Sequence, residues 1–297
     1  MNVFLTGATG FIGSHIIPLL QAAGHQVTGL VRTDVAAQQL RSIGVTPHQG
    51  TLEAPETIAS AVADADAVIH TAFDHHFERM AENCEKDKQV ILALGAALKG
   101  TQKPIIITSG VGIGDPGDGG LANEQVVNLN HPNPRVATEI AGNHLLEQGI
   151  DVRVVRLPQV HDTHRQGLIT PYIHLAKANG YAGYTGNGQS AWSACHVDDV
   201  ARLYLKVLEL GEKGQRYHAV AEESVTSLAV AQVVGAKLNI AVKSVDSADI
   251  PRYYGWFAMF AGLDLRASSA WTRSRLQWSP TGPLLLDDLN AMDYSAL

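Results

Sequence analysis

The chain has 297 residues, of which 45% are hydrophobic and 17% are charged, so it holds enough apolar material for a large core. A net charge of −7 leaves no basic stripe to neutralise phosphates, so we expect neither nucleic acid nor an anionic membrane as a partner. Cys84 and Cys195 have no paired spacing, which excludes a disulfide framework and a cysteine zinc site. No signal-peptide pattern or membrane-length apolar run is visible, so we expect a soluble, cytoplasmic protein.

Short β-rich runs alternate with helical patterns through the first half of the chain. The expected strands are residues 3–5, 27–31, 67–70, 105–108 and 152–156. Apolar residues spaced for one helical face lie between them, for example Ile12, Ile16 and Leu20, then Ile91 and Leu94. This rhythm predicts an α/β fold with a doubly wound parallel Rossmann sheet.

The pattern becomes less regular after residue 157. Pro158, Pro171 and a glycine-rich stretch at 180–188 precede helical runs at 198–210 and 224–238, the second with a capping serine. We therefore predict a Rossmann domain over residues 1–157, whose expected cofactor follows from the two segments described next. Residues 158–297 should form mainly a smaller C-terminal substrate-binding lobe, with some segments returning to the first domain. Asp198 and Asp199 suggest a helix N-cap rather than a metal site.

A glycine-rich loop follows the first expected strand at once. Residues 6–13 read Thr-Gly-Ala-Thr-Gly-Phe-Ile-Gly, a G-x-x-G-x-x-G motif that opens an apolar-faced helix. Glycines permit a tight turn and a close backbone approach to a pyrophosphate, which then faces the helix N-terminus. The expected cofactor-binding residues of this loop are Gly7, Thr9, Gly10, Phe11, Ile12 and Gly13.

The end of the second expected strand carries Arg32 and Thr33. An NAD-binding unit usually has an acid here, which takes the ribose hydroxyls. A guanidinium instead suits a 2′-phosphate, because it forms charge-assisted bidentate bonds with phosphate oxygens. The sequence therefore favours NADP(H) over NAD(H).

The order of the motifs resembles that of the extended short-chain dehydrogenases/reductases, the epimerase/dehydratase and reductase relatives. The matching segments are residues 6–13, 32, 70–72, 108–109, 156–158, 196–201 and 276–280. The resemblance covers nearly the whole chain. It implies further cofactor contacts from His70, Thr71, Ala72, Thr108, Leu157, Pro158 and Val160.

The family's catalytic pair is missing. In that family a Ser or Thr after the central strand works with a Tyr-x-x-x-Lys motif, and Ser109 matches only the first part. Counting back from Arg156 aligns Arg135 with the lysine and His131 with the tyrosine. The chain thus resembles atypical members that keep the cofactor site but lack the tyrosine. Prolines beside His131 also argue against one helix over 131–135.

Three more histidines compete for the role of proton donor. His75 and His76 follow the strand at 67–70, at the sheet edge where open α/β folds bind ligands, although they would also suit the start of a solvated helix. His161 lies where family members pass the nicotinamide. No metal site is expected, because no H-x-x-x-H or H-E-x-x-H spacing occurs. Catalytic candidates are therefore Ser109, His131, Arg135, His75 and His161.

These residues predict an NADPH-dependent carbonyl reductase of atypical type that acts on a small organic molecule. An epimerase, dehydratase or isomerase is the alternative enzyme, and a non-catalytic NADP(H) sensor is the alternative from another class. We expect a monomer or a homodimer. Substrate identity and the stereochemistry of hydride transfer are not encoded in any motif found here.

Overall fold

The computed structural model describes residues 1–296 and contains the predicted Rossmann sheet. Seven strands lie in the order β10-β6-β5-β4-β1-β2-β3, and all the pairings are parallel. The fold class is confirmed. The strands are β1 (Asn2–Thr6), β2 (Gln26–Val31), β3 (Thr46–Gln49), β4 (Ala67–His70), β5 (Pro104–Gly110), β6 (Asp151–Leu157) and β10 (Arg216–His218).

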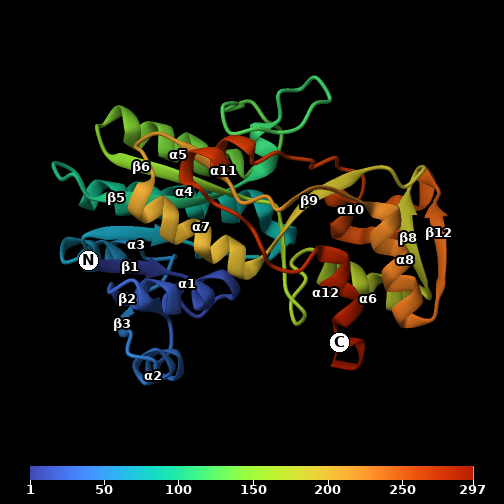
Figure 1. Ribbon diagram of the computed structural model, residues 1–297, viewed down its shortest axis with the longest axis horizontal. Helices are drawn as coiled ribbons and strands as arrows, with labels where there is room; N and C mark the ends of the chain where they lie inside the picture. Colours follow the sequence, from blue (N-terminus) through green and yellow to red (C-terminus); the bar gives the residue numbers. More distant parts are fainter. Residues whose placement is uncertain (297) are drawn as a thin grey trace.

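Helices cover both faces of this sheet, because its strands are apolar on both sides (Figure 1). One face packs against α1, α2 and α7, and the other against α3, α4 and α5. These helices are α1 (Phe11–Ala22), α2 (Asp34–Ser42), α3 (Pro55–Ala63), α4 (Met80–Ala97), α5 (Val136–Glu147) and α7 (Val197–Leu210). Strand β10 and helix α7 therefore belong to the Rossmann layers, although both lie beyond residue 157 in the sequence.

The remaining elements build a second lobe beside the carboxyl edge of the sheet (Figure 1). A three-stranded sheet, β11-β9-β7, and a two-stranded sheet, β12-β8, pack with short helices around an aromatic-rich core. The strands are β7 (Gln159–His161), β8 (Tyr181–Thr185), β9 (Ala191–His196), β11 (Glu222–Thr226) and β12 (Ala241–Val245). The helices are α6 (Ile169–Asn179), α8 (Ser227–Leu238), α9 (Ile250–Tyr254), α10 (Ala258–Ala261) and α12 (Leu285–Ala291), while α11 (Ala270–Leu276) contacts α7.

Two predicted helix starts are wrong in detail. The run at 224–238 is strand β11 followed by α8, and the cap is the Thr226 hydroxyl, which accepts from the backbone N–H of Ala229. Helix α7 is capped by His196 rather than by an aspartate. Asp199 is instead buried, where it accepts hydrogen bonds from the backbone of the 281–282 turn and joins the C-terminal segment to α7.

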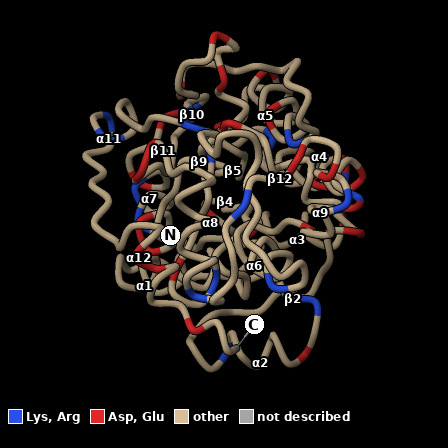
Figure 2. Tube along the Cα trace, turned by 90° about the vertical axis from the view of Figure 1, so that its right-hand side faces the viewer, with Lys and Arg blue, Asp and Glu red and all other residues tan. Residues whose placement is uncertain are grey.

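Over residues 1–296 no helix combines the length and the apolar character that crossing a membrane requires. Lys and Arg positions are dispersed along the trace among acidic ones and do not gather on one element (Figure 2).

Candidate functional site

The glycine loop between β1 and α1 has the shape of a phosphate cradle. Gly7 has a φ of 72°, a left-handed conformation that favours glycine. A Cβ atom on Gly13 would lie 2.1 Å from the carbonyl oxygen of Gly7, so no other residue fits there. Helix α1 starts with no side-chain cap and no acid in its first turn, and Thr9 and Gly10 are exposed. Its N–H groups are therefore open to an anion.

Two arginines lie near this cradle with their charges available. Arg32 is exposed at the end of β2 and has no ion pair or hydrogen bond within the described chain. Thr33 caps α2, where its hydroxyl accepts from the backbone N–H of Ala36. Arg165 comes from the second lobe, and its guanidinium carbon lies 5.8 Å from the ring centre of Phe11, the first residue of α1. No sequence motif marks Arg165.

A buried chain of hydrogen bonds runs from β1 to helix α4. The Thr6 hydroxyl and His70 Nδ1 are 2.7 Å apart, and His70 Nε2 lies 3.0 Å from Asp87 Oδ1. A carboxylate only accepts, so Nε2 donates to Asp87 and Nδ1 accepts from Thr6. The second oxygen of Asp87 accepts from the Thr138 hydroxyl at 2.7 Å. His70 is 1% exposed, and its hydrogen bond with Thr6 fixes the end of β1, directly before the glycine loop.

Asp87 also fixes the arginine that was aligned with the family's lysine. Arg135 donates through Nη1 to Asp87 at 2.9 Å and through Nη2 to the Thr108 carbonyl at 2.6 Å. Its guanidinium lies 4.1 Å above the ring centre of Phe73. Burial alone would raise the pKa of Asp87, but Arg135 and the hydrogen bonds from His70 and Thr138 outweigh it and hold that pKa below its ordinary value.

Ser109 lies at the carboxyl end of β5, as predicted, directly after Thr108, whose carbonyl accepts from Arg135. It is 3% exposed, and its hydroxyl is buried without a hydrogen-bond partner among the described residues. The neighbouring Thr108 hydroxyl is satisfied, since it donates to the His70 carbonyl and lies 2.6 Å from the Tyr204 hydroxyl. An unsatisfied buried hydroxyl is costly, so a ligand bound at this edge of the sheet could complete its bonding.

His131 and Arg135 do not share a helix, in agreement with the two prolines. Residues 131–135 form a loop, and α5 begins only at Val136. His131 Nδ1 accepts from the backbone N–H of Asn133, and the ring is partly exposed. His131 and Arg135 therefore do not lie on one helical face, as the family's tyrosine and lysine do.

His75 is exposed on the loop after β4, between the rings of Phe73 and Phe77. Partial burial by these rings, and then the charge of Arg135, lower the pKa of His75. His75 and Arg135 both contact the ring of Phe73, whereas His76 points to Asp74, with 2.6 Å between its Nδ1 and a carboxylate oxygen.

His161 is buried in the second lobe. It is 0% exposed on β7, and its Nδ1 lies 2.7 Å from the carboxylate of Asp288 on α12. Burial lowers the pKa of His161, and the hydrogen bond with Asp288 opposes this change without reversing it. Its Nε2 is buried without a hydrogen-bond partner among the described residues, and the catalytic role expected of His161 stays a prediction. Three expected cofactor contacts precede His161 in the chain. Leu157 and Pro158 are partly exposed, and Val160 is buried.

A cavity of about 480 Å³ lies between the two lobes, within the range of small-molecule sites. One wall is the loop after β5, from Gly112 to Ala122, and a second is the 131–134 segment with His131 and Asn133. The second lobe closes it with residues from α10 and the following loop: Met259, Phe260, Leu263, Asp264, Leu265 and Arg266. Because the loop starts three residues after Ser109, the cavity adjoins the carboxyl edge of the sheet.

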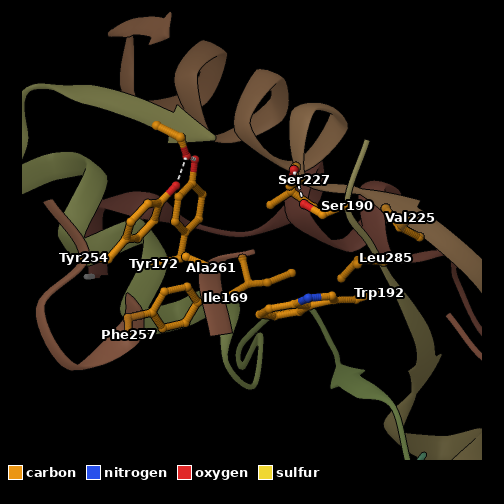
Figure 3. A pocket seen from close by; sticks show the side chains of 12 residues that line it. Ile169, Tyr172, Ser190, Trp192, Val225, Ser227, Tyr254, Phe257, Ala261 and Leu285 are labelled. Carbon is orange, nitrogen blue, oxygen red and sulfur yellow. Dashed lines mark hydrogen bonds between the residues drawn. The ribbon is translucent and has the colours of Figure 1, made fainter. Parts of the chain in front are cut away.

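A smaller cavity of about 50 Å³ lies inside the second lobe (Figure 3). Figure 3 shows the hydroxyls of Tyr172 and Tyr254 meeting at one carbonyl, that of Gly183, while Ser190 and Ser227 bond to each other. The hydroxyl groups that line this cavity therefore already have hydrogen-bond partners within the protein, and the rest of its lining is mainly apolar. It is a packing gap of the lobe core rather than a substrate site.

Asp87 is the functional residue that sequence reasoning missed. It follows Cys84 by three residues and precedes Ile91 by four, so an acid stands on the apolar face of a helix. An acid on the buried face of a helix was the signal available in the sequence, because a buried charge needs a partner of opposite charge. Phe73 gave no signal, because an aromatic residue after a strand is common.

Known proteins resemble this chain over most of its length. The model of the NAD(P)H-binding family matches residues 7–209. An uncharacterised protein of Schizosaccharomyces pombe is 40% identical over 99% of this chain and all of its own length. A 4-hydroxy-2-methyl-3-oxo-4-farnesyl-3,4-dihydroquinoline-1-oxide ketoreductase of Stigmatella aurantiaca is 27% identical, over 73% of this chain and 67% of its own.

The solved structures share the fold. The UDP-glucose 4-epimerase of Thermotoga maritima, determined with UDP-glucose, superimposes with a TM-score of 0.75 at 17% identity, covering 98% of this chain and 97% of its own. The predicted likeness to extended short-chain dehydrogenases/reductases is therefore confirmed for the fold.

Proposed function

The chain belongs to the NAD(P)H-binding family, and from this premise we propose that it is an NADPH-dependent reductase of small carbonyl compounds. The observation that carries the proposal is the pair formed by Ser109 and Arg135. The Ser109 hydroxyl is buried without a partner among the described residues, and Arg135, fixed by Asp87, donates to the carbonyl of the preceding residue, Thr108, at the carboxyl end of β5. This is where the fold presents a substrate to a dinucleotide.

The residues of the cradle fit a dinucleotide. Gly7, Gly10 and Gly13 leave room for a pyrophosphate at the N-terminus of α1, and Arg32 offers an unpaired charge for a 2′-phosphate. Bound there, NADPH would supply a hydride. Arg165, beside Phe11, would approach the pyrophosphate from the second lobe.

Two side chains can then act on the substrate oxygen and the bound ribose. The Ser109 hydroxyl can donate to an oxygen that becomes negative, and a donor of this kind strengthens as the charge develops. Arg135 stays charged and cannot relay a proton, so its role is to hold a ribose and to keep the local potential positive. The Thr108 carbonyl and Asp87 orient its two nitrogens.

The proton must come from a group other than the family's tyrosine. His131 lines the interlobe cavity, and His75 lies against Phe73 next to Arg135. A protonated imidazole can act as a general acid. We favour His131, since it faces the space that a substrate would fill.

The test measures the binding of both cofactors by calorimetry, followed by NADPH consumption with a panel of carbonyl compounds. NADPH should bind more tightly than NADH. Arg32→Ala should weaken NADPH about ten- to a hundredfold with little effect on NADH, as expected for one lost charge-assisted phosphate contact.

Arg165→Ala provides the matched comparison, because a pyrophosphate contact is common to both cofactors and should weaken them equally. Equal binding of NADH and NADPH by the parent protein would refute the cofactor preference. Tight NADPH binding without reduction of any carbonyl compound would favour the non-catalytic sensor instead.

A further inference from the structure

The side chains that line the interlobe cavity carry more negative than positive free charge. Asp115 and Asp264 contribute two carboxylates to its lining. Its one guanidinium, Arg266, pairs with Asp264 at 2.8 Å and also donates to the Gly119 carbonyl at 3.2 Å. Apart from His131, the lining residues therefore offer no free cation to an anionic substrate.

Apolar side chains dominate the wall that the second lobe contributes. Met259 is 44% exposed and Leu263 is 38% exposed, although the core of this lobe is well packed around them. Phe260, behind them, packs edge-on against Phe77 from the loop after β4, so the wall is anchored to the Rossmann domain. Exposed apolar side chains inside a cavity indicate a surface that a ligand covers.

The opposite wall is polar, and Asp115 is its one charged lining residue. It consists of the glycine-rich loop from Gly112 to Gly120 together with His131 and Asn133. These residues can offer hydrogen bonds to one polar group of a ligand near the end of β5, while the apolar wall takes the rest of the ligand.

We propose that this cavity takes an uncharged carbonyl compound with an apolar body, and that it rejects substrates bearing phosphate or carboxylate groups, nucleotide sugars included. The inference rests on the proposed reductase function for the carbonyl group. The charge argument is independent of it, since a phosphate would meet two carboxylates without a free guanidinium to compensate them. The apolar body would lie on Met259 and Leu263.

The experiment compares two ketones that differ only in charge, 4-phenylbutan-2-one and 4-(3-oxobutyl)benzoate, with UDP-glucose as a third probe. Their binding is measured by calorimetry on protein saturated with the oxidised cofactor, so that no reduction occurs. The neutral ketone should bind at least tenfold more tightly than its carboxylate counterpart, and UDP-glucose should not compete with it.

Variants of the wall make the test specific. Leu263→Asp should weaken the neutral ketone about tenfold or more, because it replaces apolar contact by a charge. Leu210→Asp, at an exposed leucine on α7, is the control and should change nothing. Asp264→Asn frees Arg266 and should improve binding of the carboxylate probe roughly three- to tenfold.

Equal or tighter binding of the charged probes would overturn the proposal. So would a Leu263→Asp variant that binds the ketone like the parent, or the absence of binding by the neutral ketone. Reduction is then assayed separately with the reduced cofactor. Ketone binding without reduction would count against the reductase and support the cavity assignment, whereas reduction of the charged probe alone would do the reverse.

Discussion

Replacing Asp87 with asparagine perturbs the connection between the cofactor loop and Arg135 while keeping the size of the side chain. Asp87 is 2% exposed, and its two oxygens serve His70, Arg135 and Thr138. The amide oxygen of the introduced asparagine can still accept from Arg135, but the compensating negative charge is lost. The guanidinium would then be nearly buried without a counter-charge.

The expected cost follows from that burial. Removing one partner of a buried ion pair destabilises proteins by about 3–5 kcal/mol. Because the Arg135 side chain keeps 13% exposure, we expect the lower end, about 3 kcal/mol. For a chain of this size, that corresponds to a fall in Tm of roughly 6–12 °C.

The dependence on pH gives an independent check. The pKa of Asp87 in the folded protein is below its ordinary value of 3.8, so the stabilisation is complete above that value and is lost as the pH falls through the lower, folded pKa. The free-energy difference between the parent and Asp87→Asn should therefore be full at about pH 7 and shrink below about pH 4.

Urea unfolding and calorimetry at both pH values measure the effect. Asp249→Asn is the control, because its partner Arg252 is 80% exposed and a surface pair of this kind contributes about 0–1 kcal/mol. Arg135→Met in the Asp87→Asn background should cost less than the sum of the two single changes. An Asp87→Asn variant within about 0.5 kcal/mol of the parent at neutral pH would refute the reasoning, since surface changes alone reach that size.

Four other outcomes are expected. Gly10→Val should lower cofactor affinity in calorimetry at least tenfold without unfolding the protein, because the side chain would occupy the pyrophosphate space. Ser109→Ala should lower turnover on the order of a hundredfold yet leave Tm unchanged, since its hydroxyl loses no partner in the free protein; a matching loss of Tm would mean a structural role. His131→Gln should remove the decline in rate toward high pH and lower turnover on the order of a hundredfold or more, and an unchanged pH–rate profile would exclude it as the proton donor. Gly183→Ala should destabilise the second lobe by about 1–3 kcal/mol in urea unfolding, because its Cβ would lie 2.6 Å from a methyl group of Val245.

The sequence predicted the parts of this protein that depend on local pattern. Five expected strands lie where β1, β2, β4, β5 and β6 are found. Short apolar runs that alternate with helical patterns are typical of the buried strands of a parallel sheet. The glycine loop followed from spacing alone, because a strand, a tight turn and a helix start are contiguous. Ser109 at the end of β5 and the broken helix before Val136 were predicted in the same way.

Only the tertiary structure decided which of the candidate residues meet. His161 and Asp288 are 127 residues apart in the chain, and their contact pairs a candidate histidine with a carboxylate that no local pattern links to it. Asp87 lies on helix α4 and Arg135 on the loop before α5, and no periodicity links them. A buried charge is stable only beside a group that compensates it. Tertiary packing, and not the neighbours in sequence, brings that group into contact.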